Sequence, residues 1–216
     1  MSKQQEALAR AVLEHGGQTY ASEADIKLDD KPGPLYQLLV LAIMMSAPIS
    51  GGIALASARE LFSAGFTTPQ KMRDATWQQR IDAMVKGGYR RYDESTSTTL
   101  GESAELVLDR YGGDLRNLAK QAGGDVAALR SSLKEVKGIG NVGADIFLRE
   151  AQGVWPAARP YLDKQAIKGA QRLGLPDDHD ALAKLVRDDD LDRFVAGLVR
   201  AARDKKLTET ILDDAK

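Results

Sequence analysis

The sequence contains no cysteine and few histidines, and these absences exclude several kinds of chemistry. Without cysteine, its 216 residues form no disulfide, thiol nucleophile, or cysteine-ligated zinc or iron–sulfur cluster. The only imidazoles, those of His15 and His179, lie far apart in the sequence. A histidine-rich metal site or a His-dependent catalytic triad would therefore be a coincidence, and we expect no metal site and no cofactor.

Long hydrophobic runs are also absent. The most apolar stretch, Pro34–Met45 (PLYQLLVLAIMM), is shorter than the roughly 18–20 residues of a membrane-spanning helix and is typical of a buried core helix. The first ten residues, MSKQQEALAR, lack the apolar segment of a secretory signal. We therefore expect a cytoplasmic protein that has no membrane partner.

Neither sign of charge dominates the chain. Lys and Arg total 30 against 31 for Asp and Glu, which gives a net charge of −1. A polycation that coats nucleic acid by charge alone is excluded, so any nucleic-acid site must be a local patch. The 43% of hydrophobic and 28% of charged residues are typical of a globular protein with one large domain or two small ones.

Helix-forming residues and paired glycines predict an all-α fold. Ala, Leu, Arg, Lys, Glu and Gln dominate, strict apolar/polar alternation is rare, and Asp114 and Asp125 follow glycine pairs as helix N-caps. Loop-like stretches at 20–34 and 153–162 bracket the middle of the chain. We expect a central helical lobe at 35–150 and a second lobe made of 1–34 and 151–216. The predicted helices span 3–15, 34–46, 53–64, 69–75, 77–86, 94–111, 114–121, 125–136, 141–152, 163–173, 178–187, 189–203 and 207–214.

A glycine motif in Leu133–Glu150 (LKEVKGIGNVGADIFLRE) has three interpretations. It matches G-x-G-x-x-G, with Asp163 20 residues beyond Gly143, as in a dinucleotide site. That site requires a buried strand before the glycines, whereas DVAALRSSLKEVK is charged and has helical periodicity. A helix–hairpin–helix would instead present backbone N–H groups to a phosphate, and a plain helical corner would use the glycines only for packing. The hairpin would comprise Lys137, Gly138, Ile139, Gly140, Asn141, Val142 and Gly143.

Four blocks in order give this sequence a family resemblance over roughly residues 34–175. Lys134–Leu148 resembles the hairpin of the endonuclease III-like DNA glycosylase superfamily. Pro34–Ala47 is similar to its early core helix, which ends in a leucine-serine-alanine turn, and Gly87–Tyr89 to its glycine-leucine-tyrosine loop. Gly153–Asp163 resembles its glycine-tryptophan-proline segment, which leads to the catalytic aspartate, and an arginine follows at Arg172.

The resemblance implies a two-lobed helix–hairpin–helix glycosylase fold and a set of site residues. Asp163 would be the catalytic carboxylate at a helix start, where the residue type alone indicates only an N-cap. Lys164 would contact phosphate, or else be a solvated lysine. The loop residues Tyr89, Arg90 and Arg91 would face DNA, or else form a solvated turn whose aromatic packs on the core. The base pocket would include Ser46, Ala47 and Pro48.

Three departures from the family pattern narrow the expected activity. Val142 occupies the position of the lysine nucleophile of the bifunctional members, the cysteines of the iron–sulfur loop are missing, and Pro48 replaces a glutamine. We therefore expect a monofunctional glycosylase that flips a damaged or mismatched base of double-stranded DNA and hydrolyses its N-glycosidic bond. It would act as a nucleoid-associated monomer, with room for a monovalent cation at the hairpin carbonyls. The alternatives are a non-catalytic helix–hairpin–helix DNA-binding protein and, on the glycine fingerprint alone, a nicotinamide-dependent enzyme.

Overall fold

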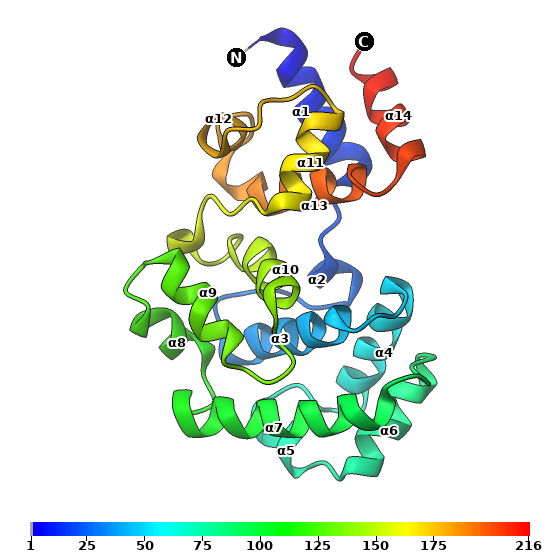
Figure 1. The fold of residues 1–216 in the computed structure, drawn as a ribbon, viewed down its shortest axis with the longest axis vertical. Helices are drawn as coiled ribbons and strands as arrows, with labels where there is room; N and C mark the ends of the chain where they lie inside the picture. Colours follow the sequence, from blue (N-terminus) through cyan, green and yellow to red (C-terminus); the bar gives the residue numbers. More distant parts are fainter. Residues whose placement is uncertain (1) are drawn as a thin grey trace. The chain divides into compact units, whose positions relative to one another are not determined.

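The computed structural model describes residues 2–216 and confirms the all-α prediction, because no strand occurs in that range. Nor is any helix in it long and apolar enough to cross a membrane. Sequence patterns missed the short helix α2 and the 3₁₀ turns, and placed most other helix ends within a residue or two. The elements, seen in Figure 1, are α1 (Lys3–Gly16), α2 (Tyr20–Glu23), α3 (Pro32–Ser46), α4 (Gly51–Ser63), α5 (Pro69–Asp74), α6 (Trp77–Lys86), α7 (Asp93–Tyr111), α8 (Leu115–Gln121), α9 (Val126–Lys134), α10 (Asn141–Ala151), η1 (Pro156–Ala158), α11 (Lys164–Arg172), α12 (His179–Ala183), η2 (Asp188–Asp190), α13 (Leu191–Ala201) and α14 (Lys205–Asp214).

The chain divides into two units at positions that differ from the predicted boundaries. The terminal unit comprises the chain up to Tyr20 together with Leu148–Lys216, and the central unit comprises Ala21–Phe147. Residues 21–34 thus belong to the central unit rather than to the N-terminal segment. The reason is tertiary: the Arg59 guanidinium on α4 donates to the Glu23 carbonyl through Nε at 2.7 Å and lies 3.3 Å from the Asp25 carboxylate.

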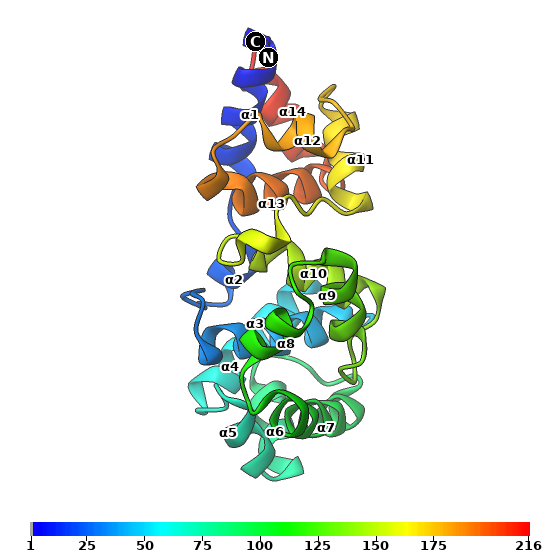
Figure 2. The ribbon, with the colours of Figure 1, turned by 90° about the vertical axis from the view of Figure 1, so that its left-hand side faces the viewer.

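Close backbone approach organises the terminal unit, in which α13 packs against α1, α11 and α14 (Figure 2). Phe194, on α13, is fully buried in this core. A Cβ added to Gly169 on α11 would lie 1.8 Å from the Leu198 carbonyl oxygen of α13. Only glycine therefore allows these two helices to approach so closely.

Helix α3 forms the core of the central unit, as its apolar sequence predicted. Its residues from Leu35 to Met44 have almost no side-chain exposure except at Gln37. Nearby, the buried guanidinium of Arg80 on α6 donates to the Met72 carbonyl at 2.9 Å, the Ala75 carbonyl at 2.7 Å and the Ser97 hydroxyl at 3.2 Å. These bonds tie α5, α6 and α7 together and satisfy a buried cation's donors.

Candidate functional site

The glycine motif folds as two helices joined by a tight turn, α9 and α10. Gly138 has φ +85°, and a Cβ there would lie 2.6 Å from Thr99 Cγ2, so the turn needs glycine both for its conformation and for its contact with α7. The Ile139 side chain is buried and anchors the turn in the core. Because a helix and not a strand precedes Gly138, the dinucleotide-site interpretation is wrong.

The outer face of this turn is open. A Cβ on Gly140 would meet nothing within 4 Å, and Val142 is 57% exposed. The first-turn N–H groups of α10 have no acceptor within their own helix and carry its positive dipole end. Lys137 adds an exposed ammonium, which lies 3.5 Å from the Glu102 carboxylate. The turn thus combines backbone donors and a cation on an accessible surface.

Ser46, the first of the predicted pocket residues, lies directly beside the hairpin. Ser46 ends α3 and donates its hydroxyl to the Ala42 carbonyl at 2.6 Å. A Cβ on Gly143 would lie 2.6 Å from the Ser46 hydroxyl oxygen, so the start of α10 packs tightly on this turn. Ala47 is half-buried and Pro48 is exposed. Tertiary structure therefore brings together two segments about a hundred residues apart in sequence.

The loop between α6 and α7 corrects one predicted contact. Tyr89 is 1% exposed and its hydroxyl forms a 3.0 Å hydrogen bond with the Thr96 hydroxyl, so its ring faces the core and is not available to DNA. Burial also raises the pKa of the Tyr89 phenol. Arg90 and Arg91 are exposed, as expected. The exposed aromatic of this loop is Tyr92, which the sequence does not distinguish from Tyr89 because both flank the same two arginines.

Asp163 combines two contacts in the terminal unit. It is the N-cap of α11 and accepts a 3.0 Å hydrogen bond from the Ala166 N–H through Oδ1. Its Oδ2 lies 2.6 Å from Nη1 of Arg149, which is in the last turn of α10. The Asp163 and Arg149 side chains are only 7% and 4% exposed, so this is a buried, charge-assisted pair. The neighbouring Lys164 is exposed to solvent.

Hydrogen bonds hold the irregular segment before Asp163 against the end of α10. The Gln152 side-chain amide donates to the Tyr161 carbonyl and accepts from the Tyr161 N–H, both at 3.0 Å. Arg159 donates Nη2 to the Gly153 carbonyl at 2.8 Å. Sequence reasoning missed Arg149, Gln152 and Arg159. The available signals were only polar residues at the end of α10 and an arginine in the irregular segment that follows it.

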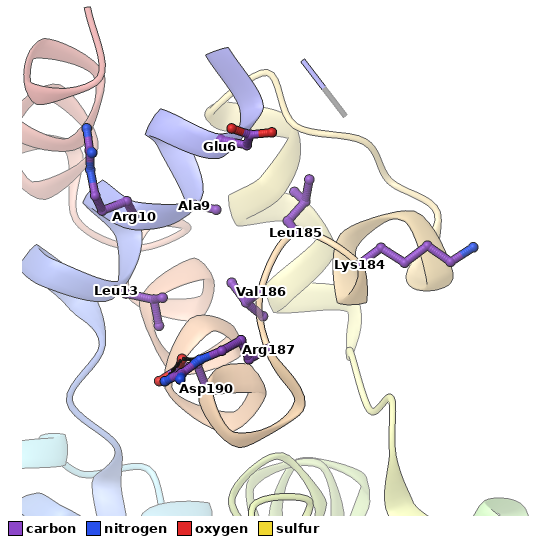
Figure 3. A pocket seen from close by; sticks show the side chains of 9 residues that line it. All are labelled: Glu6, Ala9, Arg10, Leu13, Lys184, Leu185, Val186, Arg187 and Asp190. Atoms are coloured by element: carbon purple, nitrogen blue, oxygen red, sulfur yellow. Dashed lines mark hydrogen bonds and ion pairs between the residues drawn. The ribbon is translucent and has the colours of Figure 1, made fainter. Parts of the chain in front are cut away.

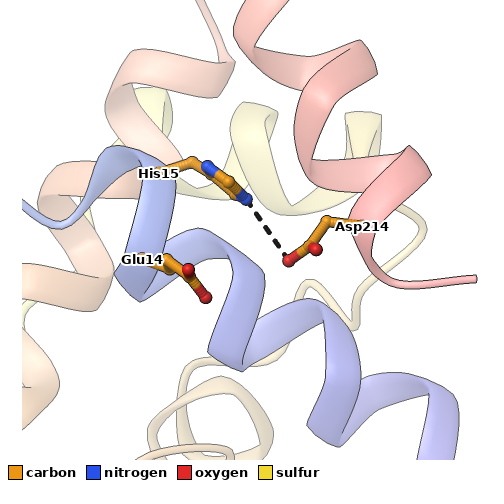
Figure 4. Close-up of side chains that lie close together, drawn as sticks. All are labelled: Glu14, His15 and Asp214. Carbon is orange, nitrogen blue, oxygen red and sulfur yellow. Dashed lines mark ion pairs between the residues drawn. The ribbon is translucent and has the colours of Figure 1, made fainter.

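Two further features of the terminal unit lie outside the predicted site. Figure 4 shows Glu14, His15 and Asp214, whose ligand-type atoms lie within 4.8 Å of one another on the surface. His15 Nε2 is 3.3 Å from Asp214 Oδ2, a contact that brings the ends of α1 and α14 together. Figure 3 shows the side chains that line a pocket between α1 and the segment after α12. The volume of this pocket is about 410 Å³, and none of its lining residues is a predicted site residue.

Comparison with known proteins identifies the fold. No family model matches the sequence, and no curated protein sequence matches it. A solved structure described as a non-covalent endonuclease III–DNA complex matches with a TM-score of 0.50 at 17% identity, covering 93% of this chain and 85% of that one. The fold is endonuclease III-like. A trapped covalent endonuclease III–DNA intermediate is also similar, with the same coverage and identity and a TM-score of 0.49.

Within the endonuclease III-like fold, the predicted residues fall into two groups. The hairpin, the Ser46–Pro48 turn and the Arg90–Arg91 loop belong to the central unit, whereas Asp163 and Lys164 belong to the terminal unit. Helix α10 links the groups in sequence, since it begins at the hairpin and carries Arg149 near its end. Within the central unit, the accessible cations and N–H groups suit an anionic ligand.

Proposed function

We propose that this protein is a monofunctional DNA glycosylase that binds duplex DNA through the hairpin and hydrolyses the N-glycosidic bond with Asp163. The observation that carries the proposal is the open face of the hairpin, where Gly140 leaves unobstructed space in front of the N-terminus of α10. A phosphate that approaches at Gly140 meets no side chain at that position and can reach the backbone N–H groups of the turn.

The chemistry is assigned to Asp163. Departure of a base leaves positive charge on the sugar, and a carboxylate fixed near that charge stabilises the transition state. The Ala166 N–H and the Arg149 guanidinium fix the Asp163 carboxylate at both oxygens, which supplies the necessary positional order. In the proposed reaction Asp163 also orients the attacking water.

A strand-cleaving step is not part of the proposal. Schiff-base formation needs an amine beside the sugar, and the position at which the bifunctional glycosylases carry their lysine is occupied by the exposed Val142. Hydrolysis without a covalent enzyme–sugar bond leaves an intact strand with an abasic site. In the proposed reaction water is then the only nucleophile, and Asp163 orients it.

A second candidate, a non-catalytic DNA-binding protein, is favoured by one observation. Arg149 lies 2.6 Å from Oδ2 of Asp163, and an opposite charge so close weakens the field that the carboxylate exerts on a developing cation. Under this alternative the buried pair only stabilises the helix start. DNA binding through the hairpin is common to both candidates.

Product analysis on a panel of duplexes, each with a single lesion or mismatch, tests the proposal. We expect one or more duplexes to release free base under single-turnover conditions and to yield a strand that breaks only after alkali treatment. Release of no base from any duplex, with retained and salt-dependent DNA binding, would establish the non-catalytic alternative. Absence of both binding and base release would refute both candidates.

A further inference from the structure

Three side chains of metal-ligand type meet at the surface of the terminal unit. Glu14 and His15 lie in the last turn of α1, whereas Asp214 ends α14, and Figure 4 shows the three side chains gathered at these helix ends. One ligand atom of each residue, a ring nitrogen or a carboxylate oxygen, lies within 4.8 Å of the other two. The fold therefore brings three potential ligands from opposite ends of the sequence to one place.

The spacing of these atoms suits a single bound ion. His15 Nε2 and Asp214 Oδ2 are 3.3 Å apart. Two ligands that bind Zn²⁺ at about 2.0–2.2 Å in a tetrahedral arrangement are about 3.4 Å from each other, so this pair needs almost no movement. The third ligand needs a shift of about 1–2 Å, which rotation of the exposed Glu14 side chain supplies.

The chemistry of the donors selects the class of ion. An imidazole and two carboxylates offer one nitrogen, two oxygens and two negative charges, a set that suits Zn²⁺ and similar transition-metal ions. Mg²⁺ and Ca²⁺ prefer ligand sets made of oxygen alone. The side chains of His15 and Asp214 are 29% and 46% exposed, so an ion reaches them from solvent.

The helices that carry the ligands are held in place by other contacts. Leu8 and Val12 of α1 and Ile211 of α14 are buried in the core of the terminal unit. The Gln4 side-chain amide donates to the Ala215 carbonyl at 3.1 Å, which is a second connection between the two segments. The backbone positions of the ligands are therefore set before an ion binds, which lowers the entropic cost of binding.

We propose that Glu14, His15 and Asp214 form a Zn²⁺ site that joins α1 to α14. An ion at this place links distant parts of the sequence, and such a link stabilises the folded state by constraining the unfolded chain. The sequence carries no signal for the site, because a single histidine and two carboxylates so far apart match no known ligand spacing. The inference does not rest on the proposed function, since none of the three residues belongs to the predicted DNA site.

Calorimetric titration of the full chain, without an affinity tag, with zinc chloride tests the site. We expect the parent to bind one Zn²⁺ per chain. His15→Ala should weaken binding at least about 100-fold, because loss of a direct ligand costs more than loss of an outer-shell partner. His179→Ala is the matched control and should bind like the parent, since His179 is the only other imidazole in a sequence without cysteine.

Thermal unfolding measures the link between the helices. Zn²⁺ at about 100-fold above its Kd should raise the parent's Tm by about 5–10 °C, whereas the same concentration of Mg²⁺ should leave it unchanged. Without metal, His15→Ala should melt close to the parent, because an exposed ion pair contributes little to stability. A parent that binds Zn²⁺ without a rise in Tm would overturn the link.

Glu14→Gln gives a test that leaves the contact between His15 and Asp214 intact. It should keep the parental Tm without metal and weaken Zn²⁺ binding at least about 10-fold. Parental Zn²⁺ affinity in both His15→Ala and Glu14→Gln, or no stoichiometric Zn²⁺ binding by the parent, would refute the site and leave only an ion pair. Loss of binding in His179→Ala would place the ion elsewhere and refute it as well.

Discussion

The buried pair of Arg149 and Asp163 makes Asp163→Asn a substitution with a large structural effect. From sequence alone the change would preserve the helix start, because Asn is as good an N-cap as Asp. In the structure it also leaves the Arg149 guanidinium, 4% exposed, without its countercharge. Removal of one partner of a buried ion pair costs about 3–5 kcal/mol. The retained cap and an amide oxygen that still accepts from Arg149 favour the lower end, about 3 kcal/mol.

The expected Tm decrease follows from the size of the chain. For proteins of 150–250 residues, 1 kcal/mol corresponds to about 2–4 °C, so Asp163→Asn should melt about 6–12 °C below the parent. Arg149→Met should also destabilise the folded protein, because it leaves the buried Asp163 carboxylate without its countercharge. The double variant, Arg149→Met with Asp163→Asn, removes both charges. It should recover much of the lost free energy of unfolding, since replacement of a buried ion pair by uncharged residues is often near neutral.

A double-mutant cycle by urea unfolding measures this coupling directly. We expect an interaction free energy of about 2–3 kcal/mol between Arg149 and Asp163. A coupling below about 0.5 kcal/mol, with a parental Tm for Asp163→Asn, would show that the pair does not stabilise the fold. The double variant also serves the functional test: if it folds, loss of base release by about 10²–10³-fold relative to Arg149→Met is assigned to the carboxylate itself.

Three further predictions use the same structure. Gly140→Trp should leave the Tm unchanged, because the site is open, yet weaken binding of unrelated duplexes about equally in anisotropy titrations; binding at parental affinity would refute the hairpin assignment. With Val142 in the lysine position, borohydride should trap no covalent protein–DNA adduct during base release, and a trapped adduct would contradict monofunctional hydrolysis. Burial raises the pKa of Asp192, so its ionisation destabilises the folded state as pH rises above the unfolded value of about 3.9. At pH 7, Asp192→Asn should therefore raise the free energy of unfolding, measured with urea, by about 1 kcal/mol or less, and below about pH 3.5 it should not raise it. An equal increase at both pH values would refute burial of the charge as the cause.

Local patterns in the sequence determined most of the secondary structure. Helix starts at Thr76, Asp114 and Asp125 follow from side chains that accept backbone N–H bonds a few residues later, an interaction that needs no distant partner. The buried core helix α3 and the tight turn at Gly138 likewise follow from composition and from the conformational freedom of glycine. These features are encoded within one or two helical turns.

Only the tertiary structure decided the properties of the site. Tyr89 and Tyr92 flank the same arginines, and long-range packing alone buries the first and exposes the second. Arg149 meets Asp163 across 14 positions of sequence, and the Glu23 carbonyl meets Arg59 across 36, which moves the unit boundary to residue 20. Burial and ion pairing depend on which surfaces the helices present to one another, and a one-dimensional pattern does not specify that arrangement.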